Sequence, residues 1–182
     1  MVGKDALSIP PDLGITYGPN ILRLDLSLNR LSNLEGIQGF TELRELILDG
    51  NEIDDDVIFP VLSYLDTLTM NKNKITNLEP LLEKISEHLP SLTYLSLLGN
   101  TACPNELSNL EKDEEDYQRY RYFVLHKLPN LKFLDSKPVS EKEREEGLRR
   151  GAFLKVIAPE EQSVDEDCKK ERRNLYTPLP QQ

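Results

Sequence analysis

The stretch Leu43-Arg-Glu-Leu46-Ile-Leu48-Asp-Gly-Asn51 is one of four copies of a short phrase, L-x-x-L-x-L-x-x-N, that decides the fold of this chain. The other three copies read Ile21-Leu-Arg-Leu24-Asp-Leu26-Ser-Leu-Asn29, Leu65-Asp-Thr-Leu68-Thr-Met70-Asn-Lys-Asn73 and Leu92-Thr-Tyr-Leu95-Ser-Leu97-Leu-Gly-Asn100. Their asparagines lie 22, 22 and 27 residues apart. Self-similarity at such a period predicts a solenoid, in which each repeat buries its apolar face against its neighbours.

Four matches in register resemble the leucine-rich repeat proteins. The alternating apolar residues of each phrase predict a short strand, and successive strands would stack into a parallel sheet on the concave side. After each asparagine the apolar residues recur in steps of three and four, which predicts 3₁₀ or α turns on the convex side. In the longer third repeat we expect a helix from Asn77 to His88. The predicted fold is an α/β leucine-rich repeat solenoid with a helical carboxyl-terminal cap.

The asparagine of each phrase has a structural reason to stand at its position. The backbone leaves the strand there, and its amide and carbonyl groups would be buried without partners. An asparagine side chain has two donors and an acceptor, which can satisfy groups of adjacent coils. We therefore expect a structural ladder formed by Asn29, Asn51, Asn73 and Asn100.

Changes in periodicity divide the chain into three expected parts. Residues 1–20 are an amino-terminal edge segment, whose apolar residues either cover the open end of the solenoid or belong to a frayed terminus. Residues 21–157 form the repeat domain, with its cap over about 103–157. Residues 158–182 are polar and alternately charged, which predicts a disordered tail. The candidates for covering the amino-terminal end are Leu7, Ile9, Leu13 and Ile15.

The expected cap begins where the repeats end, because the last coil would otherwise expose apolar core. A helix with an acidic first turn is expected over residues 113–127, and the half phrase Leu128–Asp135 can add a last strand. A second helix is expected over Val139–Arg150, with Ser140 as its N-cap. Apolar residues within 153–157 would then anchor its end.

Composition limits the function classes. The chain has 182 residues, of which 38% are hydrophobic and 30% charged, and its net charge is −10. This acidity argues against direct binding to a nucleic-acid backbone. We find no signal peptide, no integral membrane segment and no lipidation motif, and we expect Cys103 and Cys168 to remain unpaired. The sequence thus predicts an intracellular, cytoplasmic monomer in a reducing compartment.

Catalytic and metal-binding patterns are missing from the sequence. His88 and His126 have no serine or cysteine partner in context, and Cys103 stands before a proline at a turn, where packing is expected. The acidic run Asp54–Asp56 would begin a convex helix, since the spacing of a calcium loop is absent. We expect no enzyme activity, no metal and no cofactor.

Protein binding is expected on the concave face, where the variable positions of each phrase project from the sheet. Polar residues dominate its amino-terminal end, whereas Ile47, Tyr94, Leu98 and Phe133 form an apolar spot typical of an interface, unless the cap covers them. The expected concave residues are Arg23, Asp25, Glu45, Ile47, Asp49, Thr67, Thr69, Asn71, Tyr94, Ser96 and Leu98. A second candidate, either a peptide motif or an inert tail, consists of Tyr176, Thr177, Pro178, Leu179 and Pro180.

Two blocks carry a closer resemblance. Asp116–Asp135, followed by Val139 and Glu143-Arg144, resembles the cap of the spliceosomal U2 A-prime protein and the acidic nuclear phosphoproteins. The stretch Cys103–Tyr117 is similar to the melanocyte differentiation-associated branch of the intracellular leucine-rich repeat proteins.

This second resemblance implies a non-enzymatic adaptor in melanocyte differentiation and pigmentation. Such an adaptor works in trafficking to melanosomes, at endosomal or melanosomal membranes, with Rab GTPases and an endosomal recycling complex as partners. Members of that branch continue to an acidic carboxyl terminus suited to the recycling complex, whereas this chain stops at Gln182, which puts that link in doubt. The alternative is a nuclear ribonucleoprotein or chromatin subunit that binds a partner protein as U2 A-prime does.

Overall fold

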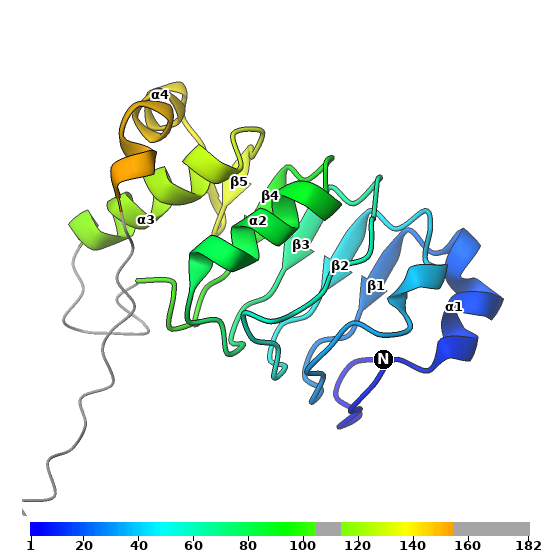
Figure 1. The fold of residues 1–182 in the computed structure, drawn as a ribbon. Helices are drawn as coiled ribbons and strands as arrows, with labels where there is room; N and C mark the ends of the chain where they lie inside the picture. Colours follow the sequence, from blue (N-terminus) through cyan, green and yellow to red (C-terminus); the bar gives the residue numbers. More distant parts are fainter. Residues whose placement is uncertain (105–113, 155–182) are drawn as a thin grey trace, which may run out of the picture.

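Short strands run side by side along one face of the molecule (Figure 1). The computed structural model describes residues 1–104 and 114–154. Its six-stranded sheet has the order β1-β2-β3-β4-β5-β6, in which the first five strands are parallel and β6 is antiparallel to β5. The predicted solenoid is confirmed. The strands are β1 (Arg23–Asp25), β2 (Glu45–Ile47), β3 (Thr67–Thr69), β4 (Tyr94–Ser96), β5 (Phe133–Leu134) and β6 (Lys137–Pro138).

The leucine at the centre of the strand phrase explains this register. Leu46, Leu68 and Leu95 are fully buried, while the residue before each of them is half-buried on the other face. Side chains of a strand alternate between its two faces, so the phrase directs one face to the core and leaves the other open. The buried apolar residues form one cluster that extends from Ile9 to Leu134.

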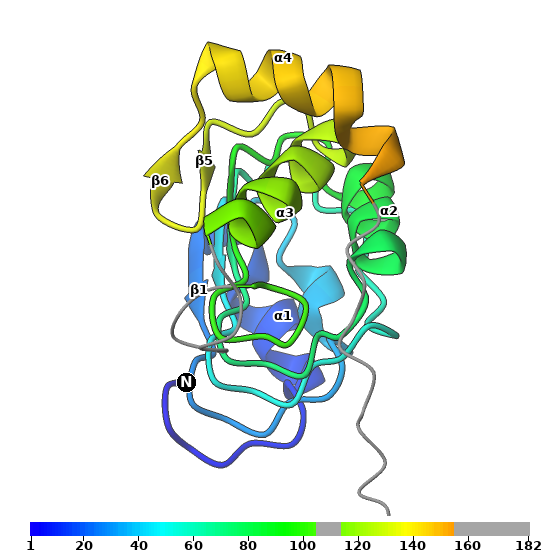
Figure 2. The ribbon, with the colours of Figure 1, turned by 90° about the vertical axis from the view of Figure 1, so that its left-hand side faces the viewer.

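Helices cover the opposite side and the two ends of the sheet (Figures 1 and 2). α2 (Leu78–His88) lies in front of the strands in Figure 1, and the Asn77 side chain accepts a hydrogen bond from the Glu79 amide at its start. At the carboxyl end, α4 (Glu141–Arg150) packs on α3 (Glu114–Lys127). The expected helices of the third repeat and of the cap are thus confirmed, and a capping box of Ser140 and Glu143 begins α4.

Close glycine contacts join the end elements to their neighbours. At the amino-terminal end, α1 (Pro11–Tyr17) and η1 (Gly18–Asn20) lie on η2 (Ile37–Gly39). A Cβ atom added to Gly39 would lie 2.5 Å from the carbonyl carbon of Gly14. At the other end, α4 continues into η3 (Gly151–Phe153), and Gly147 and Gly151 meet the backbone of α3. Only hydrogen in place of a side chain allows these backbones to approach so closely.

Three local predictions were wrong. Asp54–Asp56 begins no helix, because the Asp55 carboxylate instead accepts hydrogen bonds from the amides of Thr76 and Asn77 in the next repeat. Of the four amino-terminal candidates, Leu7 and Ile15 are 64% and 76% exposed, whereas Ile9 is fully buried and Leu13 packs against the core. Phe153 is 87% exposed and anchors nothing in the described part of the chain. Leu154, another predicted anchor, is half-buried. The anchors Val156 and Ile157, together with Cys168 and the tail motif Tyr176–Pro180, lie outside the described residues.

Candidate protein-interaction site

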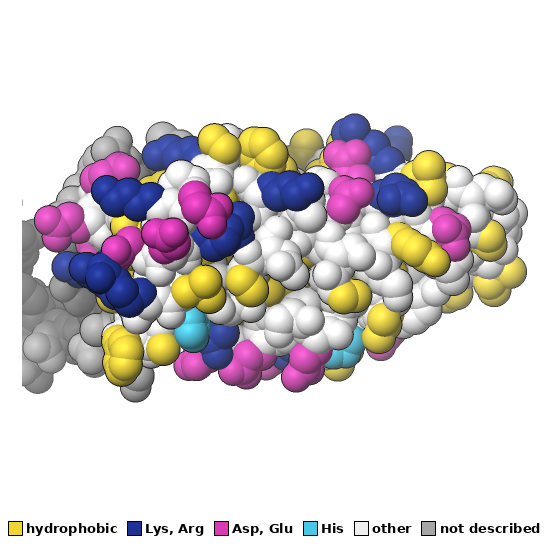
Figure 3. Space-filling view, turned by 90° about the horizontal axis from the view of Figure 1, so that it is seen from above, with side chains coloured by type: hydrophobic (Ala, Val, Ile, Leu, Met, Phe, Trp, Pro, Cys, Tyr) yellow, Lys and Arg dark blue, Asp and Glu magenta, His cyan; other side chains and the backbone are white. Residues whose placement is uncertain are grey.

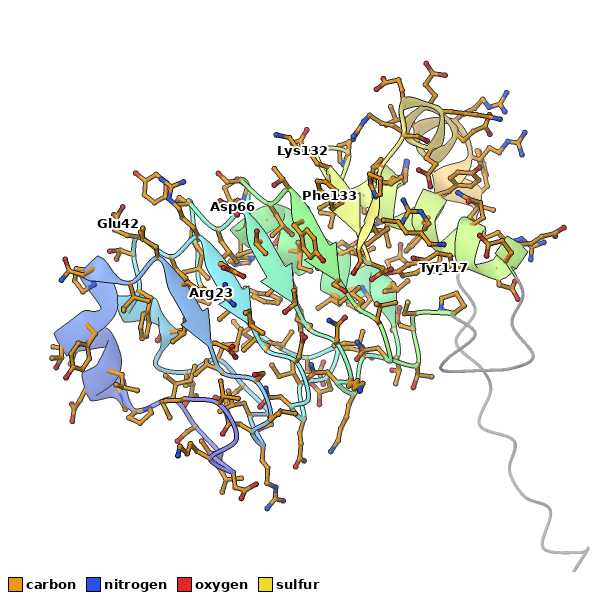
Figure 4. All side chains as sticks on the ribbon, turned by 180° about the vertical axis from the view of Figure 1, so that it is seen from behind. Arg23, Glu42, Asp66, Tyr117, Lys132 and Phe133 are labelled. Carbon is orange, nitrogen blue, oxygen red and sulfur yellow. The ribbon has the colours of Figure 1, made fainter. Side chains whose placement is uncertain are left out.

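The outward face of the sheet, which is the predicted concave face, changes character along the solenoid. Its first column is formed by the opening residue of each parallel strand, in register from Arg23 through Glu45, Thr67 and Tyr94 to Phe133 (Figure 4). The Arg23 guanidinium lies 3.3 Å from the Glu45 carboxylate. At the other end the rings of Tyr94 and Phe133 stack with their centroids 6.0 Å apart. The column therefore runs from an ion pair to an aromatic pair.

The aromatic pair is open to solvent in the described structure. Phe133 is 44% exposed, and Tyr94, Ile47 and Leu98 are half-buried. Lys132, next to Phe133, is exposed. Exposed aromatic rings with a charged side chain beside them have the composition of a protein-binding surface. No described element of the cap buries it.

The second column corrects one predicted site residue. Asp25, Ile47, Thr69 and Ser96 are in register, but Ser96 is only 1% exposed and cannot contact a partner. Its hydroxyl donates a hydrogen bond of 2.7 Å to the Asn71 side-chain oxygen. The alternation of side chains along the strand predicted that Ser96 lies on the open face. The burial of its side chain depends instead on the neighbouring repeat.

A second polar ladder occupies the end of the strands and was missed by the sequence reasoning. The Asn71 amide group donates to Asp49 at 3.0 Å, and its oxygen accepts from the Leu98 backbone N–H at 2.8 Å. Polar residues at this position of consecutive phrases (Ser27, Asp49, Asn71) were the available signal. Asp49 and Asn71 are thus committed to internal bonds, which leaves the first column as the main candidate surface.

Asp25 is likewise held within the sheet. Its carboxylate accepts the hydroxyl of Ser27 at 2.7 Å and the Ser27 backbone N–H at 3.0 Å. The hydrogen bond from the Ser27 hydroxyl lowers the pKa of Asp25 from its ordinary value, and burial opposes this shift. This carboxylate therefore keeps its negative charge at the amino-terminal end of the face.

The phrase asparagines bond to backbone groups of adjacent coils. Asn51 donates from its side chain to the carbonyls of Leu26 and Leu48, and its oxygen accepts from the Leu31 amide. Asn100 repeats the arrangement with Met70, Leu97 and Ile75, and Asn29 reaches back to Met1 and Ala6. These bonds hold the turns that carry the candidate face.

Arg121 joins the cap elements and was not singled out in the sequence. Its side chain is 3% exposed, donates to Glu143 at 2.7 Å and donates to the Leu134 carbonyl at 2.9 Å. Burial acts to raise the pKa of Glu143, but the hydrogen bond from Arg121 outweighs it and the pKa falls to about 2. The pair fixes the β5–β6 hairpin, and with it Phe133, against α3 and α4.

A buried carboxylate sits in the turn of that hairpin. Asp135 and Ser136 both have positive φ angles, 53° and 68°, which a two-residue hairpin turn of this hand requires. The Asp135 carboxylate accepts the Leu97 N–H at 2.8 Å and the Tyr117 hydroxyl at 3.4 Å. Burial raises the pKa of Asp135 and raises the pKa of Tyr117 to about 12. These groups connect the last repeat to the cap.

Metal-ligand clusters and membrane-spanning helices are two features not found in the described ranges 1–104 and 114–154. These ranges contain no group of three or more His, Cys, Asp or Glu side chains placed to hold a metal ion. They also contain no helix that is long and apolar enough to cross a membrane. Cys103 is buried, and His88 bonds through its ring to the Lys84 carbonyl at 3.0 Å. Figure 3 shows acidic and basic side chains interspersed over the cap and the upper rim.

Comparisons with known proteins agree with this architecture. A family model described as leucine-rich repeat matches residues 12–153. The human leucine-rich melanocyte differentiation-associated protein is 59% identical over 160 residues, which cover 86% of this chain and 80% of that protein. The U2 small nuclear ribonucleoprotein A' of Candida albicans is 34% identical, over 66% of this chain and 47% of its own length.

A solved structure extends the likeness to three dimensions. The match is to the Drosophila melanogaster SNF/U2A' complex, with a TM-score of 0.64 and 23% identity, over 85% of this chain and 83% of that chain. At this identity the likeness shows the shared fold alone. The chain spans about half the length of the Candida albicans U2A' protein that it matches.

Proposed function

This chain belongs to the leucine-rich repeat family, and from that premise we propose that it is a non-enzymatic adaptor that binds a protein partner on its sheet face. The observation that carries the proposal is the stacked pair Tyr94–Phe133, which stands open on the first column of the sheet. Large aromatic side chains supply much contact area at low entropic cost, and for that reason they dominate binding energies at interfaces.

The rest of the face adds specificity to this centre. The ion pair Arg23–Glu45 lies at the far end of the same column, and Thr67 separates it from the aromatic pair. Lys132 supplies a positive charge beside Phe133. A partner of matching shape would place apolar side chains on the aromatic pair and polar groups over Arg23 and Glu45, since charged rims select partners more than they add affinity.

The biological role that we propose follows the relative with 59% identity. The chain would serve melanocyte differentiation and pigmentation, in melanosomal or endosomal trafficking, with a Rab GTPase on the sheet face. An endosomal recycling complex would be a second partner, bound outside the sheet. The likeness in sequence, over most of both chains, supports the part of this role that the name of the relative states, which is melanocyte differentiation.

The alternative is a nuclear subunit that binds a partner protein in the manner of the U2A' proteins. The shared fold and the 34% identity to the Candida albicans protein favour it, but this chain covers 47% of that protein. The localisation of the tagged full chain in pigment cells separates the two roles. Vesicular puncta would support the adaptor, and nuclear speckles would support the alternative.

Binding itself can be tested with the double variant Tyr94→Ala and Phe133→Ala. Loss of a central aromatic contact costs about 2 kcal/mol or more, so we expect partner capture to weaken roughly thirtyfold or more. The matched control is Leu148→Ala, because Leu148 is 57% exposed on α4, away from the sheet face. If the folded double variant kept every partner at wild-type strength, the sheet face would not be the binding site.

A further inference from the structure

A groove opens on the convex side, between the first two repeats. It has a volume of about 550 Å³ and is lined by residues within 32–38 of repeat one and 54–60 of repeat two. The helix predicted after Asp54 did not form, so repeat two has no element there comparable to α2 of repeat three. The space that a helix would fill is therefore open.

Ile58 is the apolar side chain that the groove leaves uncovered. Its neighbours Val57 and Phe59 are buried at 2% and 1%, whereas Ile58 is 78% exposed and lines the groove. The amides of Val57 and Leu62 donate to backbone carbonyls, and in the described structure the Ile58 amide is not among the hydrogen-bond donors. This stretch therefore offers a partner both apolar surface and a free backbone donor.

The charged side chains that line the groove are all acidic. Glu35, Asp54 and Asp56 line it, and its lining includes no lysine or arginine. Arg30 and Lys74 bind Glu52, at 3.1 Å and 2.9 Å, and the Lys84 ammonium donates to the backbone carbonyl of Asp55 at 2.7 Å. Within the described residues, the carboxylates of the groove take part in no salt bridge and can attract positive charge.

We propose that this groove binds an extended segment of a partner protein that carries an apolar residue flanked by lysine or arginine. The apolar residue would lie against Ile58, and the flanking cations would face Glu35 and Asp56. A bound metal is not what this site fits, since no described cluster offers metal-ligating geometry. The site lies apart from the sheet face, so it goes beyond the function proposed above and does not depend on it.

The test uses the full chain and a labelled hexapeptide of two lysines, two leucines and two lysines, blocked at both ends. A matched peptide with glutamates in place of the lysines is the charge control. We expect the basic peptide to bind at least tenfold more tightly than the acidic one, and its binding to weaken as salt rises. In ¹H–¹⁵N spectra, the shifted amides should fall within 32–38 and 54–60.

Two matched variants locate the contact. Ile58→Ser should raise the dissociation constant of the basic peptide at least tenfold, because it removes the apolar contact without adding charge. A rise of less than twofold would contradict the proposal. Val61→Ser should change the constant less than twofold, since Val61 is 66% exposed on the same segment but does not line the groove. The double change Glu35→Gln with Asp56→Asn should weaken binding and flatten its salt dependence. Equal effects of the two serine variants, shifts confined to the sheet face, or no preference for the basic peptide would each overturn the proposal.

Discussion

Asn73 shows how one side chain can hold neighbouring repeats together. Its amide group donates to the carbonyls of Leu48, at 2.9 Å, and Asn71, at 3.2 Å, and its oxygen accepts from the Ile53 amide at 3.1 Å. Replacement by alanine would leave the Ile53 amide without a partner, and the carbonyls of Leu48 and Asn71 would keep only their bonds from Asn51 and Gly50. We expect Asn73→Ala to lower the free energy of unfolding by about 1–3 kcal/mol, measured by urea denaturation.

The control for Asn73 is an asparagine on the surface. Asn130 is exposed between α3 and β5, so Asn130→Ala should change the free energy of unfolding by less than about 0.5 kcal/mol. Equal stability of the two variants would contradict a structural role for Asn73.

Glu143 should make the stability of the cap depend on pH. Its pKa is lowered from 4.5 to about 2 in the folded state, chiefly through Arg121 against the opposing effect of burial. When a carboxyl group has a lower pKa in the folded state than in the unfolded state, it stabilises the protein at pH values above the unfolded pKa. This stabilisation is lost as the pH falls toward the folded pKa. We therefore expect the wild-type Tm to fall more than the Tm of Glu143→Gln between about pH 4.5 and 2. Parallel curves for the two proteins would argue against this linkage.

Residues whose role follows from the repeat could be predicted, and residues whose role depends on a distant partner could not. The buried leucines and the position of Asn100 follow from the phrase itself. Arg121 stands in the sequence among aromatic residues of a helix, and nothing local shows that its guanidinium is buried against Glu143 and Leu134. Ser96 was placed on the open face because the burial of its hydroxyl depends on Asn71, 25 residues away.

The elements at the amino-terminal end depend on backbone contact. A Cβ atom at Gly39 would lie 2.5 Å from the carbonyl carbon of Gly14 and 2.7 Å from its oxygen, which are backbone atoms that cannot move unless α1 moves. Gly39→Ala should therefore cost about 1–3 kcal/mol of stability. It should also speed hydrogen exchange of the α1 amides.

Thr41→Ala is the control for Gly39→Ala, since Thr41 is exposed two residues further on. Its exchange rates in α1 should match those of the wild type. If Gly39→Ala left α1 equally protected, the glycine contact would not be what holds that helix.

Sequence patterns predicted long elements better than short ones. α2 and α4 have capping side chains, Asn77 and Ser140, together with enough residues to show a pattern. α1 begins at Pro11, a residue that suits the first turn of a helix but reads as a breaker when the contact with η2 is unknown. The acidic residues of repeat two are typical of the start of a helix, and they therefore predicted a convex helix there. In the structure, Asp55 instead accepts hydrogen bonds from repeat three.

The whole molecule is a stack in which each coil contacts its neighbours, and the contacts that cap its two ends differ. Glycine contacts close both ends, but only the carboxyl end adds the buried pair Arg121–Glu143. This arrangement places the aromatic pair on the last two parallel strands, where the cap holds β5 firmly, and leaves the convex groove near the less reinforced end. The two proposed surfaces are separate and differ in the partner chemistry that they fit, which suits an adaptor.

Cooperativity between the two ends can be measured with Gly39→Ala and Gly151→Ala. A Cβ atom at Gly151 would lie 2.3 Å from the Cβ of His126 on α3, so this change disturbs the carboxyl cap alone. Gly39 lies in η2, which packs on α1, and Gly151 lies in η3, which packs on α4. α1 and α4 lie at opposite ends of the solenoid (Figure 1). If the chain unfolds as one unit, the two losses of free energy should add within about 0.5 kcal/mol in a single transition. Two separate transitions would show instead that the ends unfold independently. A double variant whose loss of free energy differs from the sum by more than about 1 kcal/mol would show that the ends are coupled through the stack.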